Sequence, residues 1–154
     1  MQRSFTQQSS ASVKNQVYTD VLILNDVKVN FQNHPMKKVN LEQKFSLFSE
    51  HWSPKIVGEL NGQHVKLAKL KGEFVWHKHD EEDELFFVVK GSFKMEYRDR
   101  AVEVNENEFL IVPKGVEHKP VAEEEVWVML FEPTSTLNTG DAKSDLTKND
   151  LDSI

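Results

Sequence analysis

The sequence predicts an all-β domain, a small antiparallel sandwich or barrel, with one short helix before it. From Lys55 to Phe131, short runs rich in Val, Leu and Phe alternate with turns rich in Gly, Asn, Asp and Pro. Only the stretch near residue 45 repeats apolar residues at helical spacing. Because no second helix separates the strands, we expect antiparallel pairing rather than a parallel sheet, which needs crossover connections.

Composition limits the class of protein. The 154 residues suit one domain, and a net charge of -6 without a basic stripe makes nucleic acid a poor partner, because phosphate neutralisation supplies much of that affinity. The absence of cysteine excludes disulfides and thiolate ligands. The longest apolar runs, such as residues 126–131, are far shorter than the roughly 20 residues that span a bilayer. We therefore expect a cytoplasmic protein that binds neither nucleic acid nor membrane.

The chain divides into three segments. Residues 1–35 are expected to be an extension, largely disordered or peripheral, because their first half is polar and rich in Ser and Gln. Within it, two β-type runs in residues 21–31 predict a short hairpin. Residues 36–132 form the predicted domain. Residues 133–154 lack periodicity, and we expect a loop that wraps the domain and then a free tail.

The helix that leads the domain is predicted at residues 41–49. Asn40 can cap its start, and Gln43 stands at the spacing of a capping box. Pro54 follows its end. A helix with one apolar face needs a surface to pack on, which the strands supply. The residues of that face are Leu41, Phe45 and Phe48.

The strands follow the helix in order. Asn61 and Gly62 predict a two-residue hairpin turn between the first two strands. Later turns are marked by Gly, Asn, Asp or Pro at the boundaries of each apolar run. The predicted strands are residues 56–60, 64–70, 73–79, 84–90, 92–98, 101–104, 108–113, 118–122 and 126–131.

Histidines and acids gather at one turn of this pattern. Alternate residues of a strand face the same way, so His77 and His79 project together and suit one ion at about 2.0 to 2.2 Å from each nitrogen. Antiparallel pairing of the next strand returns Glu84 to the same face, and His118 follows a second turn. An acidic surface turn is the alternative explanation. The other histidines, expected at the surface, are His34, His51 and His64.

The order of these residues resembles the two motifs of the cupin superfamily. The first motif is His-x-His, then Glu, then Gly, and the second is Gly, Pro-x-Gly, His and Asn at fixed spacings. Asn107 stands where the second motif has Gly, and Asn tolerates the positive φ of a tight turn. Ala122 stands where it has Asn, and Gly72 is one residue away from the usual first Gly. The matching residues are His77, His79, Glu84, Gly91, Pro113, Gly115 and His118.

The resemblance implies a small single-domain, jelly-roll-like barrel over about residues 55–132. It also implies one divalent metal ion, iron, manganese, zinc, nickel or copper, and no other cofactor. Imidazoles with one carboxylate suit such borderline cations better than Ca²⁺ or Mg²⁺, which prefer oxygen ligands. The implied metal ligands are His77, His79, Glu84 and His118.

Two functions remain open from the sequence. The first is a metal-dependent enzyme that acts on a small polar substrate, such as a sugar derivative or keto acid, as an isomerase, dioxygenase, decarboxylase or lyase. The second is a metal-binding cupin that binds or senses a small molecule without turnover. The catalytic residues are unknown, and Glu73, which shares the inward parity of His77, is the one second acid that the pattern suggests.

Strand parity also predicts an apolar outer face. If Glu84 points inward, Phe86 and Val88 line the interior. A cover is then needed outside, and the helix, the N-terminal hairpin and a second subunit are the alternatives. The resemblance favours a homodimer, because small cupins are commonly dimers. The residues expected to face outward are Phe74, Trp76, Leu85, Phe87 and Val89.

Overall fold

The computed structural model of the chain describes residues 23–24, 27–28 and 38–154, and contacts divide the chain into two units between Lys37 and Lys38. In the first unit, β1 (Ile23–Leu24) and β2 (Val27–Lys28) pair antiparallel, as predicted for the hairpin. The disorder expected in the rest of residues 1–35 lies outside the described residues. In the described part, no helix is long and apolar enough to cross a membrane.

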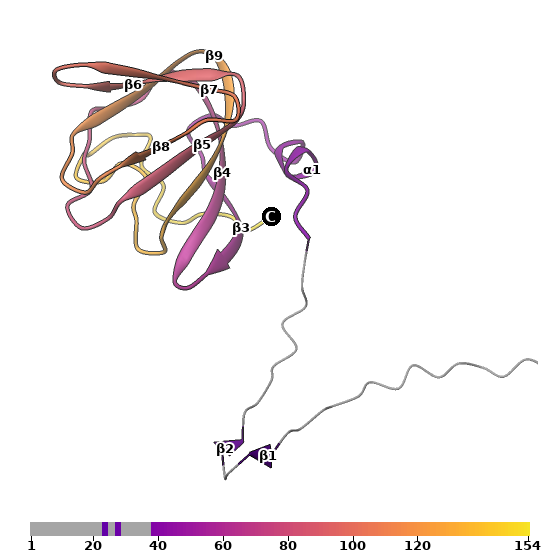
Figure 1. The fold of residues 1–154 in the computed structure, drawn as a ribbon. Helices are drawn as coiled ribbons and strands as arrows, with labels where there is room; N and C mark the ends of the chain where they lie inside the picture. Colours follow the sequence, from indigo (N-terminus) through magenta and orange to yellow (C-terminus); the bar gives the residue numbers. More distant parts are fainter. Residues whose placement is uncertain (1–22, 25–26, 29–37) are drawn as a thin grey trace, which may run out of the picture. The chain divides into compact units, whose positions relative to one another are not determined.

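The second unit is the predicted antiparallel β-barrel with one short helix (Figure 1). Its sheet runs in the order β3-β4-β9-β5-β8, and β6 pairs with β7 and β9. The elements are α1 (Leu41–Phe45), β3 (Lys55–Leu60), β4 (Gln63–Glu73), β5 (Glu84–Lys90), β6 (Ser92–Tyr97), β7 (Ala101–Asn105), β8 (Phe109–Val112) and β9 (His118–Pro133).

Strand β9 holds the barrel together, because it pairs with β4, β5 and β6. The prediction of two strands, at residues 118–122 and 126–131, is wrong. Three exposed acids, residues 123–125, interrupt the apolar pattern without ending the strand. Opposite these acids the β4–β9 register shifts, because Leu70 pairs with Val126 but Gly72 pairs with Ala122. Because such a bulge interrupts the alternation of side chains, the sequence pattern does not reveal that β9 is one continuous strand.

The predicted strand at residues 73–79 is also wrong. The ladder between β4 and β9 ends at the pair Glu73 and Val121. The next partner is Pro120, which has no N–H to donate, and only its carbonyl is used, by the N–H of Phe74. Beyond this point the segment is irregular, so strand parity no longer decides which way its side chains point.

Helix α1 is shorter than predicted, because it ends at Phe45 rather than residue 49. Its start is as predicted: the side chain of Asn40 accepts a hydrogen bond of 3.0 Å from the N–H of Gln43. Phe45 is fully buried and stacks on Trp127 of β9, with ring centroids 4.6 Å apart. The helix therefore covers one part of the outer face, including half-buried Val89.

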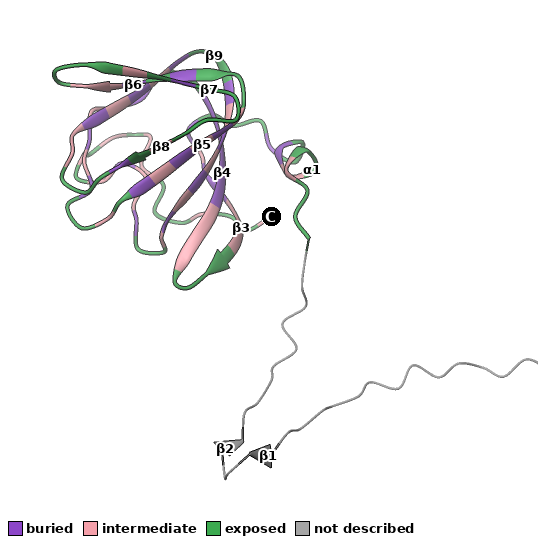
Figure 2. Ribbon diagram, viewed as in Figure 1, coloured by how far each residue is buried: buried purple, intermediate pink, exposed green. Residues whose placement is uncertain are grey.

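The barrel interior follows the predicted parity on β5. Phe86 and Val88 are buried in the main core, and Figure 2 shows buried residues along β4, β5 and β9. The outward prediction for Phe74 is wrong: it is buried against Trp52, with ring centroids 4.9 Å apart, because its segment has left the ladder. Trp76 is half-buried under the guanidinium of Arg98.

The rest of the outer face carries two apolar rows across β9, β5 and β8. In the first row, Leu85 pairs with Phe131 and Ile111, and in the second, Phe87 pairs with Met129 and Phe109. The side chains on β5 and β9 are half-buried. Those on β8 are the most exposed, at 62% for Phe109 and 50% for Ile111. Among the described residues, Met129 packs against the cluster that contains Phe45 of α1, whereas Phe109 and Ile111 are not part of that cluster.

The C-terminal segment packs on the barrel, so the predicted free tail is wrong. Ile56 of β3 donates its N–H to Asp152 and accepts from the N–H of Ile154. Lys55 forms an ion pair of 2.8 Å with the Asp152 carboxylate. These two main-chain hydrogen bonds and the ion pair do not depend on regularly spaced apolar residues, so the sequence pattern did not predict them. The preceding residues 134–151 run beside the barrel (Figure 1), and within them Asp141 donates its N–H to the carbonyl of Lys78.

Candidate metal centre

Four side chains meet inside one end of the barrel. One nitrogen or oxygen atom from each lies within 4.8 Å of the corresponding atoms of the other three. All four residues are buried, with exposed fractions of 4% or less. The structure thus brings together the four residues that the resemblance implies as metal ligands: His77, His79, Glu84 and His118.

Main-chain hydrogen bonds align the two histidine segments. His77 and His118 form an isolated antiparallel bridge, with N–O distances of 3.1 and 2.9 Å. The carbonyl of His79 accepts from the N–H of Gly115, whose φ of +75° makes the turn that carries the chain back toward His118. The predicted turn at the second motif therefore positions the third imidazole.

Glu84 reaches the centre by a different route from the one predicted. We expected its strand to pair with the strand of His77. Instead β5 pairs with β8 and β9, and Glu84, its first residue, lies opposite Val112, the last residue of β8. Since β8 leads directly into the turn before His118, this pairing brings the carboxylate beside the imidazoles.

Two of the imidazoles are oriented by a hydrogen bond from Nδ1 to a main-chain carbonyl. Nδ1 of His77 lies 3.0 Å from the carbonyl of Val75, and Nδ1 of His118 lies 2.9 Å from that of Val116. A carbonyl only accepts, so each Nδ1 carries the proton and donates it. This tautomer leaves Nε2 of both rings with a free lone pair, as a metal ligand requires.

The inner atoms of the centre lack partners within the described residues. Nε2 of His79, Nε2 of His118 and Oε2 of Glu84 are buried without a hydrogen bond. Oε2 lies 3.4 and 3.5 Å from the two nitrogens, longer than the usual hydrogen bond. One ion with bonds of about 2.1 Å joins atoms up to about 4.2 Å apart, so a small contraction places all four on it. The donor set therefore fits a metal ion.

Electrostatics favours the protonation states that bind metal. Burial lowers the pKa of His77 to about 4, and the neighbouring imidazole of His118 adds to the effect. Burial alone would raise the pKa of Glu84, but His118 and His79 lower it by more, to below its usual range. At neutral pH the centre thus presents a neutral imidazole at residue 77 and an ionised carboxylate.

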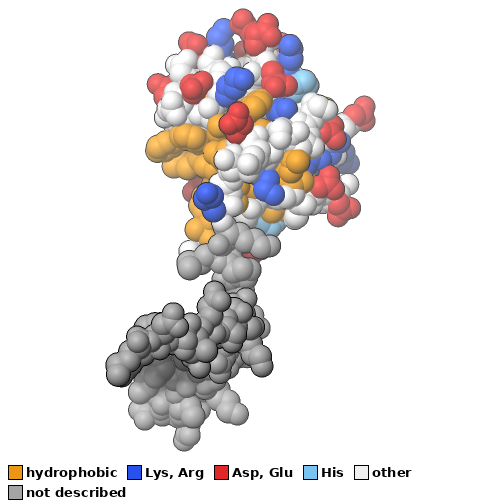
Figure 3. All heavy atoms as spheres, turned by 90° about the vertical axis from the view of Figure 1, so that its right-hand side faces the viewer, with side chains coloured by type: hydrophobic (Ala, Val, Ile, Leu, Met, Phe, Trp, Pro, Cys, Tyr) orange, Lys and Arg blue, Asp and Glu red, His pale blue; other side chains and the backbone are white. Residues whose placement is uncertain are grey.

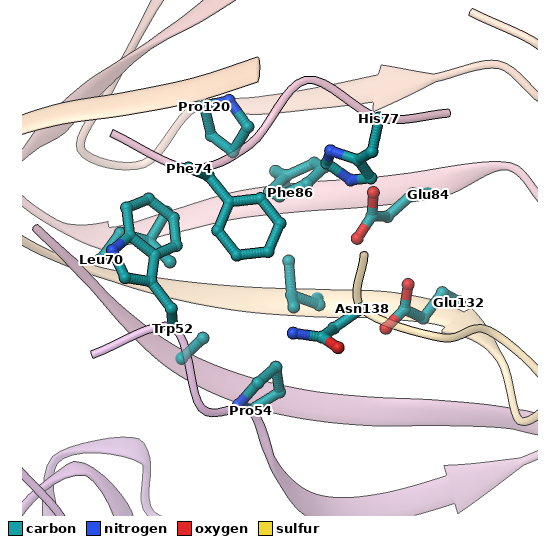
Figure 4. Close-up of a pocket in the computed structure, with 12 residues that line it drawn as sticks. Trp52, Pro54, Leu70, Phe74, His77, Glu84, Phe86, Pro120, Glu132 and Asn138 are labelled. Carbon is teal, nitrogen blue, oxygen red and sulfur yellow. The ribbon is translucent and has the colours of Figure 1, made fainter. Parts of the chain in front are cut away.

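A cavity of about 30 Å³ lies beside the centre (Figure 4). The figure shows two ends: rings of Trp52 and Phe74 at one, and the side chains of His77, Glu84 and Glu132 at the other. The remaining residues that line it are Pro54, Ala68, Leu70, Phe86, Pro120, Leu130 and Asn138.

The inward acid that sequence reasoning named is the wrong one. Glu73 is exposed and pairs with Lys119 at 2.8 Å, because the ladder ends at this residue. The acid beside the centre is Glu132, which is 1% exposed and lies 2.8 Å from the equally buried Lys66. A signal for it was present, since Glu132 continues the inward alternation of residues 126, 128 and 130 along β9.

Burial, the charge of Glu84 and the charge of Lys66 act together on this acid. Burial raises the pKa of Glu132, and the nearby Glu84 raises it further, while Lys66 opposes both. The net pKa of Glu132 is well above its usual value.

The two other histidines in the described part of the chain take no part in the cluster. His51 lies at the surface, as predicted, and its Nε2 is 2.9 Å from the carboxylate of Glu125. His64 is half-buried on β4 rather than at the surface. His34 lies outside the described residues.

The chain was compared with known proteins. The family described as the cupin domain matches residues 63–132, which include all four clustered residues. A crystal structure of a cupin-2 domain containing protein from Shewanella frigidimarina is 46% identical, with a TM-score of 0.61, and the match covers 62% of this chain and 93% of that one. The chain belongs to the cupin superfamily. A crystal structure of protein NMB1881 from Neisseria meningitidis is 31% identical, with a TM-score of 0.59, and the match covers 64% of this chain and all of that one.

A curated relative of this cupin carries no activity in its name. The chain is 38% identical over 64 residues to "Uncharacterized protein YdbB" of Bacillus subtilis. This match covers 41% of the chain and 57% of YdbB, so it spans little more than half of the relative's length.

Two of the three departures from the cupin motifs are residues that take the place of Gly and Asn in the second motif. Asn107 has a φ of +67°, so it supplies the turn that Gly makes in the motif. Ala122 is fully buried in the core and pairs with Gly72 across the β4–β9 ladder. Neither residue lies among the four clustered donors.

Proposed function

We propose that His77, His79, Glu84 and His118 bind one divalent transition-metal ion, and that this cupin is a metal-dependent enzyme acting on a small polar substrate. One observation carries the proposal: three donor atoms of the cluster are buried without partners and within reach of a single ion. A buried polar atom left unpaired costs about 1 to 3 kcal/mol, and an ion removes that cost. The neighbouring cavity gives a substrate its place.

The donor set narrows the ion and the chemistry. Three imidazoles and one carboxylate suit iron, manganese, zinc, nickel or copper. A bound ion would supply Lewis-acid polarisation of a carbonyl or hydroxyl oxygen, the chemistry of isomerases, dioxygenases and lyases on sugar derivatives or keto acids. This chain's own residues orient the imidazoles through their Nδ1 hydrogen bonds and exclude bulk water by burial.

A metal-binding cupin that holds a small molecule without turnover is the second candidate. The lining of the neighbouring cavity favours it. Most of its walls are apolar, so few side chains there can move a proton.

Metal content tests the proposal. We expect His79→Ala to lose stoichiometric transition metal, while His64→Ala, a histidine outside the cluster, keeps it. Elemental analysis of the purified proteins gives the answer, and equal metal content in the two variants would reject the centre.

Turnover separates the two candidates. Hydroxyacetone in deuterium oxide exchanges the hydrogens beside its carbonyl when that carbonyl is polarised. Exchange that is faster with the metal-loaded wild type than with His79→Ala favours an enzyme. Binding of hydroxyacetone without exchange favours the binding protein.

We also propose that two copies pair through the outer rows of β5, β8 and β9. Support comes from Phe109 and Ile111, which expose large apolar side chains in adjacent rows. A homodimer in sedimentation that becomes a monomer in Phe109→Ser/Ile111→Ser fits the proposal. Leu47→Ser is the control, since Leu47 is 64% exposed just beyond α1. A wild-type monomer would contradict it.

A further inference from the structure

The buried pair formed by Lys66 and Glu132 holds an unused acceptor at the polar end of the cavity. We propose that Oε2 of Glu132 binds a hydroxyl group of the ligand, so that this site selects neutral hydroxy-carbonyl compounds over their carboxylate counterparts. The inference rests on the proposed function, because the carbonyl of such a ligand would lie at the metal centre.

The two oxygens of Glu132 have different surroundings. Oε1 lies 2.8 Å from Nζ of Lys66, whose second partner is the carbonyl of Thr136 at 3.4 Å. Oε2 is buried and has no hydrogen-bond partner within the described residues. Lys66 therefore fixes the carboxyl group through one oxygen, and Glu132 lines the cavity beside Glu84 (Figure 4).

A hydroxyl group fits the free oxygen in either protonation state of Glu132. As a carboxylate, Glu132 accepts at Oε2, and as an acid with Oε1 bound to Lys66 it donates from Oε2. A hydroxyl group both donates and accepts, so it pairs with Oε2 in both states. A ligand carboxylate only accepts, and it would be a further anion beside Glu84.

The surroundings set the size and charge of that ligand group. The cavity of about 30 Å³ holds one or two groups the size of water, so only the hydroxyl-bearing end of a ligand fits inside. Glu84 and Glu132 are both carboxyl groups at this end, which disfavours a second anion. Asn138, beside them, already donates to the carbonyl of Leu146 and accepts from the N–H of Lys148, so its orientation is fixed.

Hydroxyacetone and pyruvate are a matched pair of probes. They share a three-carbon skeleton and a ketone, but one ends in a hydroxyl group and the other in a carboxylate. Dissociation constants for both are measured from the absorption spectrum of the Co²⁺-loaded protein. In Glu132→Gln, where an amide N–H can replace Oε2, we expect the ratio of the two constants to shift toward pyruvate by about tenfold, the value of one hydrogen bond.

Two further variants serve as controls, one for a misfolded protein and one for the loss of an acid elsewhere on the same strands. Lys66→Met/Glu132→Leu removes the acceptor and leaves no lone buried charge; it should fold, keep its metal and bind hydroxyacetone about tenfold more weakly. Glu124→Gln is the matched control: Glu124 pairs with Lys71 on the same two strands, but at the surface, and its ratio should equal that of the wild type.

The outcomes separate the two proposals. If the Co²⁺-loaded wild type binds neither probe, or if the ratio is unchanged in both Glu132 variants, Glu132 is only a structural partner of Lys66 and the inference is overturned. If the wild type binds no metal, the proposed function itself has failed.

Discussion

Two groups of polar residues are buried in the same barrel, and they differ in how their charged atoms find partners. The pair of Lys66 and Glu132 is an ion pair of 2.8 Å between two side chains that are each 1% exposed. The cluster around Glu84 is as deeply buried, yet its inner atoms find no partner among the described residues. The first group contains its own cation, Lys66, although Oε2 of Glu132 is left unpaired, while the second has the donors for an ion.

This difference predicts which group depends on metal. The ion pair is formed as soon as the barrel folds, because β4 and β9 lie side by side. The cluster carries unpaired atoms until an ion is bound, so its contribution to stability depends on the ion. Breaking each group separately therefore gives different effects, described here from the largest to the smallest.

Lys66→Met should have the largest effect. It leaves the carboxyl group of Glu132 buried without its cation, and we expect the free energy of unfolding to fall by about 3 to 5 kcal/mol. Urea denaturation measures it. Lys66→Met/Glu132→Leu should recover most of the loss, and Lys71→Met, in the exposed pair, should lose less than about 1 kcal/mol. A loss in the double variant as large as in Lys66→Met would mean that packing, not charge, explains it.

Metal binding should have the next largest effect. At a free Zn²⁺ or Mn²⁺ concentration of about 100 times the dissociation constant, the free energy of unfolding should rise by about 2.7 kcal/mol. Thermal melts with and without the ion measure this rise. In Glu84→Gln the donor set loses its anion, so the rise should largely disappear. The same rise in both proteins would show that the ion binds elsewhere.

The effect of pH on the free energy of unfolding of the metal-free protein should be smaller, for each pH unit, than the effect of metal binding. The pKa of His77 falls from 6.5 in the unfolded chain to about 4 in the folded protein, so between these values the unfolded chain binds more protons. Stability is therefore full above pH 6.5 and decreases as the pH falls, by about 1.4 kcal/mol per pH unit. Urea denaturation with chelator present measures the slope. His77→Gln should flatten it, and an unchanged slope would place the titration in other residues.

Removal of the first unit should have the smallest effect. Both buried groups lie in the unit that begins at Lys38. A shortened chain that begins at Met36 should therefore melt at the temperature of the full chain and bind the same amount of metal. A chain that is unfolded at room temperature would show that residues 1–35 contribute to the domain.

The four clustered residues could be predicted from the sequence because their spacing matches the cupin motifs. Gly115 has the positive φ that its turn residues predict, and its N–H binds the carbonyl of His79, so this turn aligns the two histidine segments. Strand parity was reliable on β5, whose ladder is regular, and it placed Phe86 correctly. It failed for Phe74, because Pro120 ends the ladder one residue earlier.

Other parts of the site could not be predicted from local patterns. Glu132 had the right parity, but its partner Lys66 lies 66 residues earlier, and only the β4–β9 register joins them. The wall formed by Asn138 depends on main-chain contacts of the C-terminal segment, which leave no periodic pattern. The three acids in the middle of β9 break the apolar pattern, so the sequence predicted two short strands in place of one long strand.

Gly140 lies against the carbonyl of Lys78 and the ring of His79, and a larger side chain would collide with that backbone. Asp141 adds a hydrogen bond to the N–H of Lys78. The C-terminal segment therefore packs directly on the backbone that carries His79. A side chain at residue 140 would push this segment away from Lys78 and expose one side of the His79 ring.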